Sequence, residues 1–291
     1  MQVAGNQLQH LRQYYHQQLN SLYGEDETEA LFVTCCAHYL KLSHSAVRSQ
    51  LNSHVNQSDL LKIYDAAKAL HQQIPLQYIL GEAWFYQLPF KVNPSVLIPR
   101  PETEELVDRI LKDHPHLTSL LDLGTGSGCI PVSIKHQRPE ARVAACDISD
   151  TALETAKLNA KTNAAEVCFF KYNILGAESL NIPNPAFEVV VSNPPYIKSS
   201  EKQSMHPNVL NHEPHLALFV EGEDDILFYT KIVDLCKTVL LPGGTLYFEL
   251  NPLTAEQVLE KVMKSGLFTH AEQILDLSGK QRFLKASRNR T

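Results

Sequence analysis

The pattern of hydrophobic and polar positions divides the chain into two parts. Residues 1–74 contain no proline and only two glycines, and they are rich in Gln, Leu and Ala, a composition typical of helices. Apolar positions recur there at the three-to-four spacing of a half-buried helix, at Leu60, Leu61, Tyr64, Ala67 and Leu70. Asp26 or Thr28 can cap one helix, and Ser43 or Ser45 another. We predict a small helical bundle.

From Pro75 the pattern changes to short apolar runs separated by turn residues. Residues 84–86 and 88–92 form two β-like runs with a polar interruption between them, which predicts a hairpin that links two domains. A helix is predicted to begin after Pro101, because three glutamates follow at positions where the helix dipole favours negative charge.

Beyond this helix, strand-like and helical stretches alternate. The strand-like stretches are residues 119–123, 141–147, 167–172, 187–192 and 245–250, and the helical ones are 129–137, 152–162, 225–240 and 254–265. Such alternation predicts an α/β fold with a parallel sheet and helices on both faces. Two late runs, 271–277 and 282–286, are predicted to close the sheet as a hairpin.

Composition and charge narrow the class of protein. Of 291 residues, 44% are hydrophobic and 20% charged, which is an ordinary globular composition and excludes a disordered, collagen-like or disulfide-scaffold chain. The formal net charge is −6. Proteins that bind free nucleic acid usually carry a basic face, because neutralising phosphates supplies much of the affinity. We therefore expect no direct binding of free nucleic acid.

Neither a membrane segment nor a disulfide framework is predicted. The longest apolar run, around residues 31–37, is much shorter than the roughly 20 residues that span a bilayer, and residues 1–10 lack the features of a signal peptide. Six cysteines occur without a CxxC motif, mostly inside apolar runs. We predict a cytoplasmic protein with reduced core thiols.

A glycine-rich loop follows the first strand of the alternating region and leads into a helix. It reads Gly124-Thr125-Gly126-Ser127-Gly128. Glycines let the backbone approach a ligand and adopt positive φ, and the helix start beyond them favours a carboxylate or phosphate. A dinucleotide fingerprint would have glycine where this chain has Cys129, so binding of a pyrophosphate is the weaker interpretation. A plain tight turn remains the alternative.

Polar residues at the ends of the next two strands suggest a nucleoside site. Asp147 lies 19 residues after Gly128, close to the ~20 expected for an acid that binds ribose hydroxyls, although it could instead cap the following helix. Asn173 could contact an adenine edge, with Ile174 packed on the ring, but Asn is also a common turn residue. Together these residues predict a nucleoside cofactor across the carboxyl ends of the strands.

The fourth strand leads into Asn193-Pro194-Pro195-Tyr196. The two prolines fix φ and remove two backbone donors, so this segment presents carbonyls in a rigid extended geometry. Asn193 adds a side-chain carbonyl, and two acceptors beside a cofactor form a receptor for a planar –NH2 group. Tyr196 supplies a ring face on which a flat amide or base can lie. A proline-rich turn is the alternative interpretation.

At these residues the chain resembles the class I S-adenosylmethionine methyltransferases that modify amino groups on sp2 carbon. It is most similar to the release-factor glutamine N5-methyltransferases, the PrmC/HemK family. The likeness rests on residues 75–81, 97–104 and 193–197, followed by Glu213-Pro214, Ala217-Leu218 and Gly222-Glu223-Asp224. The Asn-Pro-Pro-Tyr motif is shared with DNA adenine and ribosomal RNA methyltransferases, whereas the 75–104 block favours protein glutamine methylation.

The resemblance implies a fold and a domain organisation. The fold is a Rossmann-like class I methyltransferase sheet, mostly parallel with the last strand antiparallel, preceded by a small helical bundle and a hairpin. The expected domains are residues 1–74 for substrate recognition, 75–95 as the hairpin linker and 96–291 as the S-adenosylmethionine-dependent methyltransferase domain.

The resemblance also implies the roles of the site residues. S-adenosyl-L-methionine is the expected cofactor and S-adenosyl-L-homocysteine the product. Its binding is assigned to the loop from Gly124 to Gly128, including Thr125, Gly126 and Ser127, and to Asp147, Asn173, Ile174 and Asn193. Asn193 and Pro194 are expected to bind the glutamine amide of the Gly-Gly-Gln motif in class 1 release factors, and Pro195 and Tyr196 complete the catalytic segment. We expect a monomer without a metal.

Several interpretations stay open. The family often has Asp at the position of Asn173, so an adenine contact there is in doubt. Arg100 either faces the cofactor carboxylate or forms a salt bridge with Glu104. His212 and His215 are three apart, but Pro214 between them argues against a helical metal site. Rival functions are glutamine methylation of a ribosomal protein, N6-adenine or N2-guanine methylation of nucleic acid, and a non-catalytic cofactor-binding module.

Overall fold

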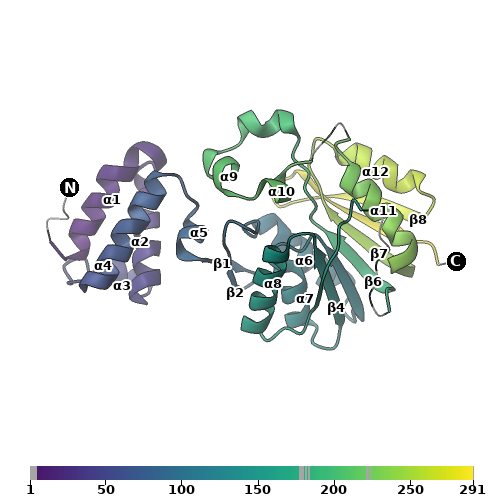
Figure 1. Cartoon of the computed structure of the whole chain (residues 1–291), viewed down its shortest axis with the longest axis horizontal. Helices are drawn as coiled ribbons and strands as arrows, with labels where there is room; N and C mark the ends of the chain where they lie inside the picture. Colours follow the sequence, from purple (N-terminus) through teal and green to yellow (C-terminus); the bar gives the residue numbers. More distant parts are fainter. Residues whose placement is uncertain are drawn as a thin grey trace. The chain divides into compact units, whose positions relative to one another are not determined.

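The computed structural model describes residues 5–176, 180, 182, 184–220, 222 and 224–290. These residues form two compact units, which Figure 1 shows as a group of helices and a sheet with helices. The first unit runs to Gly81 and includes His206–His212, and the second comprises Glu82–Met205 and the chain from Glu213 onward.

The first unit is helical and has a hydrophobic core of its own. Its elements are α1 (Leu8–Tyr23), α2 (Glu25–Leu40), α3 (His44–Ser49), α4 (Gln57–His71), α5 (Leu76–Leu80) and α9 (Pro207–His212). Fully buried side chains from α1, α2 and α4 form this core, among them Leu11, Tyr15, Phe32 and Ile63. The unit extends past residue 74, because α5 packs against the same core through Leu76, Ile79 and Leu80.

One of the two predicted helix N-caps in this unit is confirmed, and the other is not. Ser43 caps α3, as predicted, by accepting a hydrogen bond from the Ala46 N–H at 3.2 Å. The prediction for α2 was wrong, because the N-cap is Gly24, with a φ of 79°. Asp26 lies in the first turn and Thr28 is buried inside the helix. Glycine adopts this positive φ without a steric penalty, so the chain turns directly from α1 into α2.

The second unit contains a seven-stranded sheet with the order β5-β4-β3-β6-β7-β9-β8. Its strands are β3 (Ser119–Leu123), β4 (Arg142–Asp147), β5 (Cys168–Lys171), β6 (Phe187–Ser192), β7 (Leu240–Glu249), β8 (Phe268–Leu275) and β9 (Gln281–Arg288). The first five pair in parallel, and β9 lies antiparallel between β7 and β8. This confirms the predicted sheet with an antiparallel last strand and a closing hairpin.

Helices cover both faces of the sheet. On one face, α6 (Pro101–Asp113), α7 (Cys129–Gln137) and α8 (Asp150–Thr162) pack on Leu120, Val189 and Val191. On the other face, α11 (Leu227–Val239) and α12 (Ala255–Lys264) pack on Leu121, Leu123 and Val190. Consecutive strand residues thus point to opposite layers, and a continuous apolar run becomes buried on both sides.

Shorter elements complete the second unit. The strands β1 (Glu82–Phe85) and β2 (Leu88–Lys91) form an antiparallel hairpin, as predicted. Phe85 and Phe90 from this hairpin are buried in the same layer as α6 and α7, so the hairpin belongs to the sheet unit. A 3-10 helix (Ser199–Ser204) and α10 (His215–Leu218) lie between β6 and α11 in the sequence.

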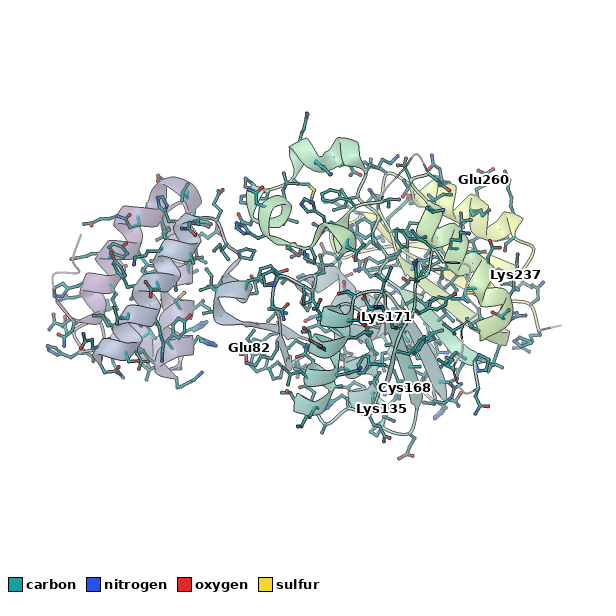
Figure 2. All side chains as sticks on the ribbon, viewed as in Figure 1. Glu82, Lys135, Cys168, Lys171, Lys237 and Glu260 are labelled. Carbon is teal, nitrogen blue, oxygen red and sulfur yellow. The ribbon has the colours of Figure 1, made fainter. Side chains whose placement is uncertain are left out.

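The cysteines are buried with one exception. Cys35, Cys36, Cys129, Cys146 and Cys236 are buried free thiols, whereas Cys168 is exposed on β5, at the edge of the sheet. Figure 2 shows Cys168 and Lys171 from this strand. The prediction of core thiols was therefore wrong for Cys168, because an edge strand leaves side chains open to solvent. In the described part of the chain, no helix is long and apolar enough to cross a membrane.

The parallel strands bring the predicted site segments to one edge of the sheet. Leu123, Asp147, Lys171 and Ser192 are the last residues of β3, β4, β5 and β6, and parallel strands end at the same edge. The glycine loop, Asp147, Asn173 and Asn193 therefore meet there, at the edge where open α/β sheets bind their ligands.

Candidate active site

A pocket of about 350 Å³ lies at this edge of the sheet. Most residues predicted for the site line it, namely Gly124, Thr125, Gly126, Ser127, Asp147, Asn173, Ile174, Asn193 and Pro195. Three predicted residues are not part of its lining, namely Gly128, Pro194 and Tyr196. Two further segments contribute to the wall of the pocket. Most residues of Ser95–Arg100 line it, and so do Pro214, Leu216 and Ala217.

The glycine loop is held to the end of β4 by its own backbone. The N–H groups of Gly124 and Thr125 donate to the Cys146 carbonyl at 3.0 and 2.9 Å, and the Gly126 N–H donates to Asp147 Oδ2 at 2.9 Å. Three consecutive N–H groups therefore already have acceptors within the protein. This arrangement disfavours a phosphate cradle, since such a cradle needs these donors for the ligand.

The three glycines of the loop meet different constraints. All have positive φ, of 78° at Gly124, 54° at Gly126 and 79° at Gly128. A Cβ on Gly128 would lie 3.0 Å from the Ala156 Cβ, whereas a Cβ on Gly126 would meet no atom within 4 Å. Gly128 is thus required where α7 begins against α8, and Gly124 and Gly126 form the wall of the pocket.

Asp147 is a partly buried carboxylate with two backbone donors. Its Oδ2 accepts from Gly126, and its Oδ1 accepts from the Ser149 N–H at 2.9 Å. Burial raises the pKa of Asp147, and these hydrogen bonds oppose the shift. The cap of α8 is Ser149, which accepts from the Ala152 N–H at 3.2 Å. Asp147 is therefore an acceptor in the pocket wall and does not cap the helix.

Asn173 is a turn residue at the pocket wall. Its Oδ1 accepts from the Leu175 N–H at 3.0 Å, and its backbone carbonyl accepts from the Gly176 N–H at 3.0 Å. The side-chain oxygen is thus engaged locally, as in other Asx turns. Tyr172 and Ile174, its neighbours, also line the pocket and give this side of the wall apolar surface.

The segment after β6 presents two acceptors. Ser192 Oγ donates to the Leu123 carbonyl at 2.6 Å, which ties the end of β6 to β3. Asn193 Nδ2 donates to Thr103 Oγ1 at 3.3 Å. Among residues that the structure describes, no donor reaches Asn193 Oδ1 or the Pro194 carbonyl. Both oxygens therefore retain lone pairs for a ligand.

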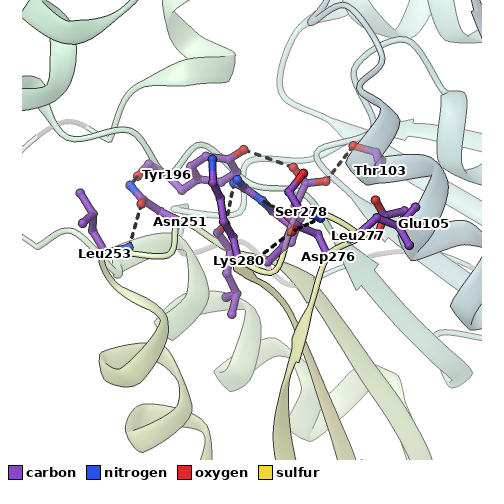
Figure 3. A network of polar contacts seen from close by, with 12 residues as sticks. Thr103, Glu105, Tyr196, Asn251, Leu253, Asp276, Leu277, Ser278 and Lys280 are labelled. Carbon is purple, nitrogen blue, oxygen red and sulfur yellow. Dashed lines mark hydrogen bonds and ion pairs between the residues drawn. The ribbon is translucent and has the colours of Figure 1, made fainter.

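Tyr196 lies beside the pocket and is held at both ends. Its hydroxyl donates to Glu249 Oε1 at 3.2 Å, and its backbone carbonyl accepts from Asn251 Nδ2 at 3.1 Å; Figure 3 shows both contacts around Tyr196. Its ring packs against the core layer of α11 and α12. Burial raises the pKa of Tyr196, so the hydroxyl stays protonated. Tyr196 is not among the residues that line the pocket, and the contact of its ring with a planar amide stays a prediction.

Two buried residues that the sequence patterns did not single out connect these groups. Thr103 in α6 donates its hydroxyl hydrogen to Glu249 Oε2 at 2.7 Å, so the Glu249 carboxylate accepts from both Thr103 and Tyr196 (Figure 3). Burial raises the pKa of Glu249, and these donors oppose the shift. The available signal was a carboxylate near the carboxyl end of an otherwise apolar strand.

Asp122 is a second buried carboxylate that the patterns did not assign. It lies in β3 with an exposed fraction of 0%, and within the described ranges neither oxygen has a hydrogen bond partner. Burial raises the pKa of Asp122 to about 7, and the neighbouring Thr125 hydroxyl offsets this only in part. A charged residue inside the apolar run Leu120–Leu123 was the sequence signal for a special environment.

Arg100 forms its ion pair with a residue that the sequence did not indicate. It lines the pocket, and its Nη2 lies 2.5 Å from Glu213 Oε1. Glu104 instead accepts from the Tyr86 N–H at 2.7 Å. The expected salt bridge with Glu104 was wrong, because the partner of Arg100 comes from a distant segment. That Arg100 faces the cofactor carboxylate stays a prediction. Glu223, one of the residues on which the family resemblance rests, lies outside the described residues. Among the described residues, no group of three or more His, Cys, Asp or Glu side chains could hold a metal ion.

The chain is similar to named methyltransferases. Residues 102–223 match the family model of the methyltransferase small domain. A release factor glutamine methyltransferase from Flavobacterium psychrophilum is 40% identical over 285 residues, which cover 96% of this chain and 99% of the relative. The protein of the same name from Bacteroides thetaiotaomicron is 38% identical over 94% of this chain and 98% of its own length.

A solved structure shares the fold. The crystal structure of a methyltransferase from Pyrococcus furiosus aligns with a TM-score of 0.51 and 19% identity, over 80% of this chain and all of that one. The sheet order, the pocket at the carboxyl edge and the sequence identity over nearly the whole chain agree. The chain belongs to the family of release factor glutamine methyltransferases.

Proposed function

We propose that this methyltransferase transfers a methyl group from S-adenosylmethionine to the side-chain amide nitrogen of the glutamine in the Gly-Gly-Gln motif of class 1 release factors. The observation that carries the proposal is a pair of open acceptors, Asn193 Oδ1 on a residue of the pocket wall and the carbonyl of Pro194, the next residue in the chain. Two acceptors recognise the two hydrogens of a primary amide. The relatives' printed name supports the same substrate.

The residues present fit S-adenosylmethionine as the cofactor. Asp147 offers acceptor capacity for hydroxyl groups, and Tyr172 and Ile174 give apolar surface for a flat ring. The buried Asp122 carboxyl, two residues before the glycine loop, favours a cationic group nearby, because burial makes its own charge costly. When bound, the cofactor supplies an electrophilic methyl group on a sulfonium centre. We propose Gly124 to Ser127, Asp147 and Ile174 as its binding residues.

The chemistry assigned to the protein is positioning of a poor nucleophile. The nitrogen of a carboxamide is weakly nucleophilic because its lone pair is delocalised into the carbonyl. Hydrogen bonds from its two hydrogens to Asn193 Oδ1 and the Pro194 carbonyl favour a pyramidal nitrogen, whose lone pair then points away from both acceptors. Fixed orientation of this kind lowers a barrier by as much as ~7–11 kcal/mol. Once the nitrogen is methylated and cationic, it is acidic enough to lose its proton to solvent, so the step requires no general base.

We also propose that the helical unit recognises the release factor. It has a hydrophobic core separate from those of the sheet unit, and none of its described residues lines the pocket. A role in binding a protein surface accounts for a unit of this kind. Removal of the chain up to Gly81 should weaken release factor binding strongly and leave the affinity for the cofactor within about threefold. Equal losses would assign the unit a stabilising role only.

One experiment tests the function directly. The protein is incubated with labelled S-adenosylmethionine and a class 1 release factor, and the product is mapped by mass spectrometry. Label on the Gly-Gly-Gln glutamine supports the proposal. Label that appears instead on a ribosomal protein or on nucleic acid offered in parallel assigns the rival substrate, and cofactor binding without any transfer assigns a non-catalytic module.

A further inference from the structure

Hydrogen bonds between side chains connect Asn193 to a buried carboxylate. Asn193 Nδ2 donates to Thr103 Oγ1 at 3.3 Å, and the Thr103 hydroxyl donates to Glu249 Oε2 at 2.7 Å. Thr103 is 3% exposed and lines the pocket, and Glu249 is 1% exposed. Asn193 and Glu249 lie 90 and 146 positions after Thr103 in the sequence. The three residues meet near the start of α6 and the ends of β6 and β7.

The direction of the hydrogen bonds follows from the number of protons. A threonine hydroxyl has a single hydrogen, and that of Thr103 is donated to Glu249 Oε2. Thr103 then offers only lone pairs to Asn193, and only the –NH2 end of the amide can meet them. The carbonyl end, Oδ1, must therefore point away from Thr103. No donor of a described residue reaches this oxygen.

Glu249 has the partners needed to carry a negative charge in the interior. Burial raises the pKa of Glu249, whereas the hydrogen bonds that Thr103 and the Tyr196 hydroxyl donate to its two oxygens and the positive charge of Arg282 oppose the shift. Hydrogen bonds to an ionised acceptor are about twice as strong as those between neutral groups. The carboxylate thus imposes a fixed direction on the hydroxyl that bridges it to Asn193.

We propose that Thr103 and Glu249 are positioning residues that fix the amide of Asn193 with Oδ1 toward the substrate, and so select glutamine over glutamate. This inference rests on the proposed function. A glutamine side chain donates two hydrogens to the acceptors at this point. A glutamate side chain has nearly the same shape but only accepts at neutral pH, so it would place its oxygens against Asn193 Oδ1 and the Pro194 carbonyl. The orientation of the Asn193 amide thereby makes the site bind glutamine in preference to glutamate.

The variant Thr103→Val tests this, because valine keeps the shape and removes the hydroxyl. We measure by calorimetry the affinities of two peptides from the release factor loop, one with Gly-Gly-Gln and one with Gly-Gly-Glu, with S-adenosylhomocysteine present. The wild-type protein should prefer the glutamine peptide by about tenfold or more, and Thr103→Val should reduce that preference to about threefold or less. Thr103→Ser keeps the hydroxyl and should restore the wild-type ratio. The affinity for S-adenosylhomocysteine should stay within about twofold in all three proteins.

Thr28→Val is the matched control. It also removes a buried threonine hydroxyl, one that has no hydrogen bond partner in the described part of the chain, and it should leave the ratio of the two affinities unchanged. A merely structural role of Thr103 predicts that Thr103→Val weakens both peptides equally. An unchanged ratio in Thr103→Val, or no rescue by Thr103→Ser, would overturn the inference.

A second measurement needs no substrate and separates this inference from the proposed function. In the free wild-type protein, the Asn193 side-chain –NH2 protons should show a nuclear Overhauser contact to the Thr103 methyl group. Absence of that contact overturns the orientation whatever the substrate is. Conversely, if the contact is present but the wild-type protein neither binds the glutamine peptide nor methylates the release factor, the proposed function has failed and the selection of glutamine fails with it.

Discussion

Arg100 Nη2 lies 2.5 Å from Glu213 Oε1, and this ion pair joins two segments that are 113 residues apart in the sequence. The Glu213 side chain is 1% exposed and that of Arg100 is 31% exposed. Glu213 Oε2 also accepts from the Ile98 N–H at 3.3 Å. Because Arg100 and Pro214 both line the pocket, the pair holds two parts of the pocket wall together.

The two partners of this ion pair should differ in their effect on stability. Arg100→Met leaves the Glu213 carboxylate buried without its cation, which should cost about 2–3 kcal/mol of unfolding free energy. Glu213→Gln keeps an acceptor for Ile98 and leaves Arg100 partly in water, so its cost should be about 1 kcal/mol. Urea denaturation of the two variants measures the difference. A larger loss in Glu213→Gln would contradict this account of the buried charge.

The loop glycines offer a matched pair of substitutions. Gly126→Ala adds a Cβ in open space at a positive φ, so only backbone strain of about 1 kcal/mol is expected. Gly128→Ala adds the same strain and places its Cβ 3.0 Å from the Ala156 Cβ, which should raise the total cost to about 2–4 kcal/mol.

Denaturation and cofactor titration together separate the two positions. Gly126 lines the pocket and Gly128 does not, so Gly126→Ala should weaken S-adenosylmethionine binding more than its small effect on stability suggests. Gly128→Ala should mainly lower stability. If Gly126→Ala were the more destabilising variant, the assignment of Gly128 to helix packing would be wrong.

The local elements could be predicted where burial on both faces makes the sequence signal unambiguous. The observed bounds of β3 and β6 coincide with the predicted ones, because continuous apolar runs end there at polar or glycine residues. β7 begins at Leu240, five residues before the predicted start. Pro242, Gly243 and Gly244 indicated a loop, but the chain already pairs with β6 through a register shift near Phe187.

The contacts within the candidate site depend on pairings between distant segments, and the sequence pattern does not contain them. The Thr103–Glu249 and Arg100–Glu213 contacts require the positions of α6, β7 and the chain before α10 relative to one another. The pattern placed Asp147 and Asn193 correctly at strand ends, since parallel strands end at a common edge. It did not place Tyr196, whose hydroxyl has a buried acceptor that only the folded sheet brings near.

Asn193→Ala tests the proposed acceptor. The substitution removes one of the two open acceptors and leaves the glycine loop and Asp147 in place. The affinity for S-adenosylmethionine should therefore stay within about threefold of the wild-type value. The turnover number with a release factor should fall by about a hundredfold or more, the loss typical of removing one preorganised polar contact to the reacting group. Calorimetry measures the binding, and transfer of labelled methyl measures turnover. Turnover equal to that of the wild type would refute the role given to Asn193.

The buried Asp122 carboxyl should make the stability of the protein fall as pH rises. Burial raises the pKa of the native carboxyl from 3.8 to about 7, whereas the unfolded chain keeps the ordinary value. Below pH of about 4 the carboxyl is protonated in both states. Between about 4 and 7 the unfolded state loses the proton and the native state keeps it, so stability falls as pH rises, and above about 7 the whole penalty is present.

Asp122→Asn removes this dependence because the amide does not titrate. The gain in stability of the variant over the wild type, measured as the difference in unfolding free energy, should therefore be about 3–4 kcal/mol larger at pH 8 than at pH 4. Urea denaturation of both proteins at several pH values measures the difference, and the comparison cancels every other titrating group. A difference that does not change between pH 4 and pH 8 would mean that Asp122 is ionised and solvated in the native protein. Water would then already compensate the charge of Asp122, and the site would not favour a cationic ligand near it.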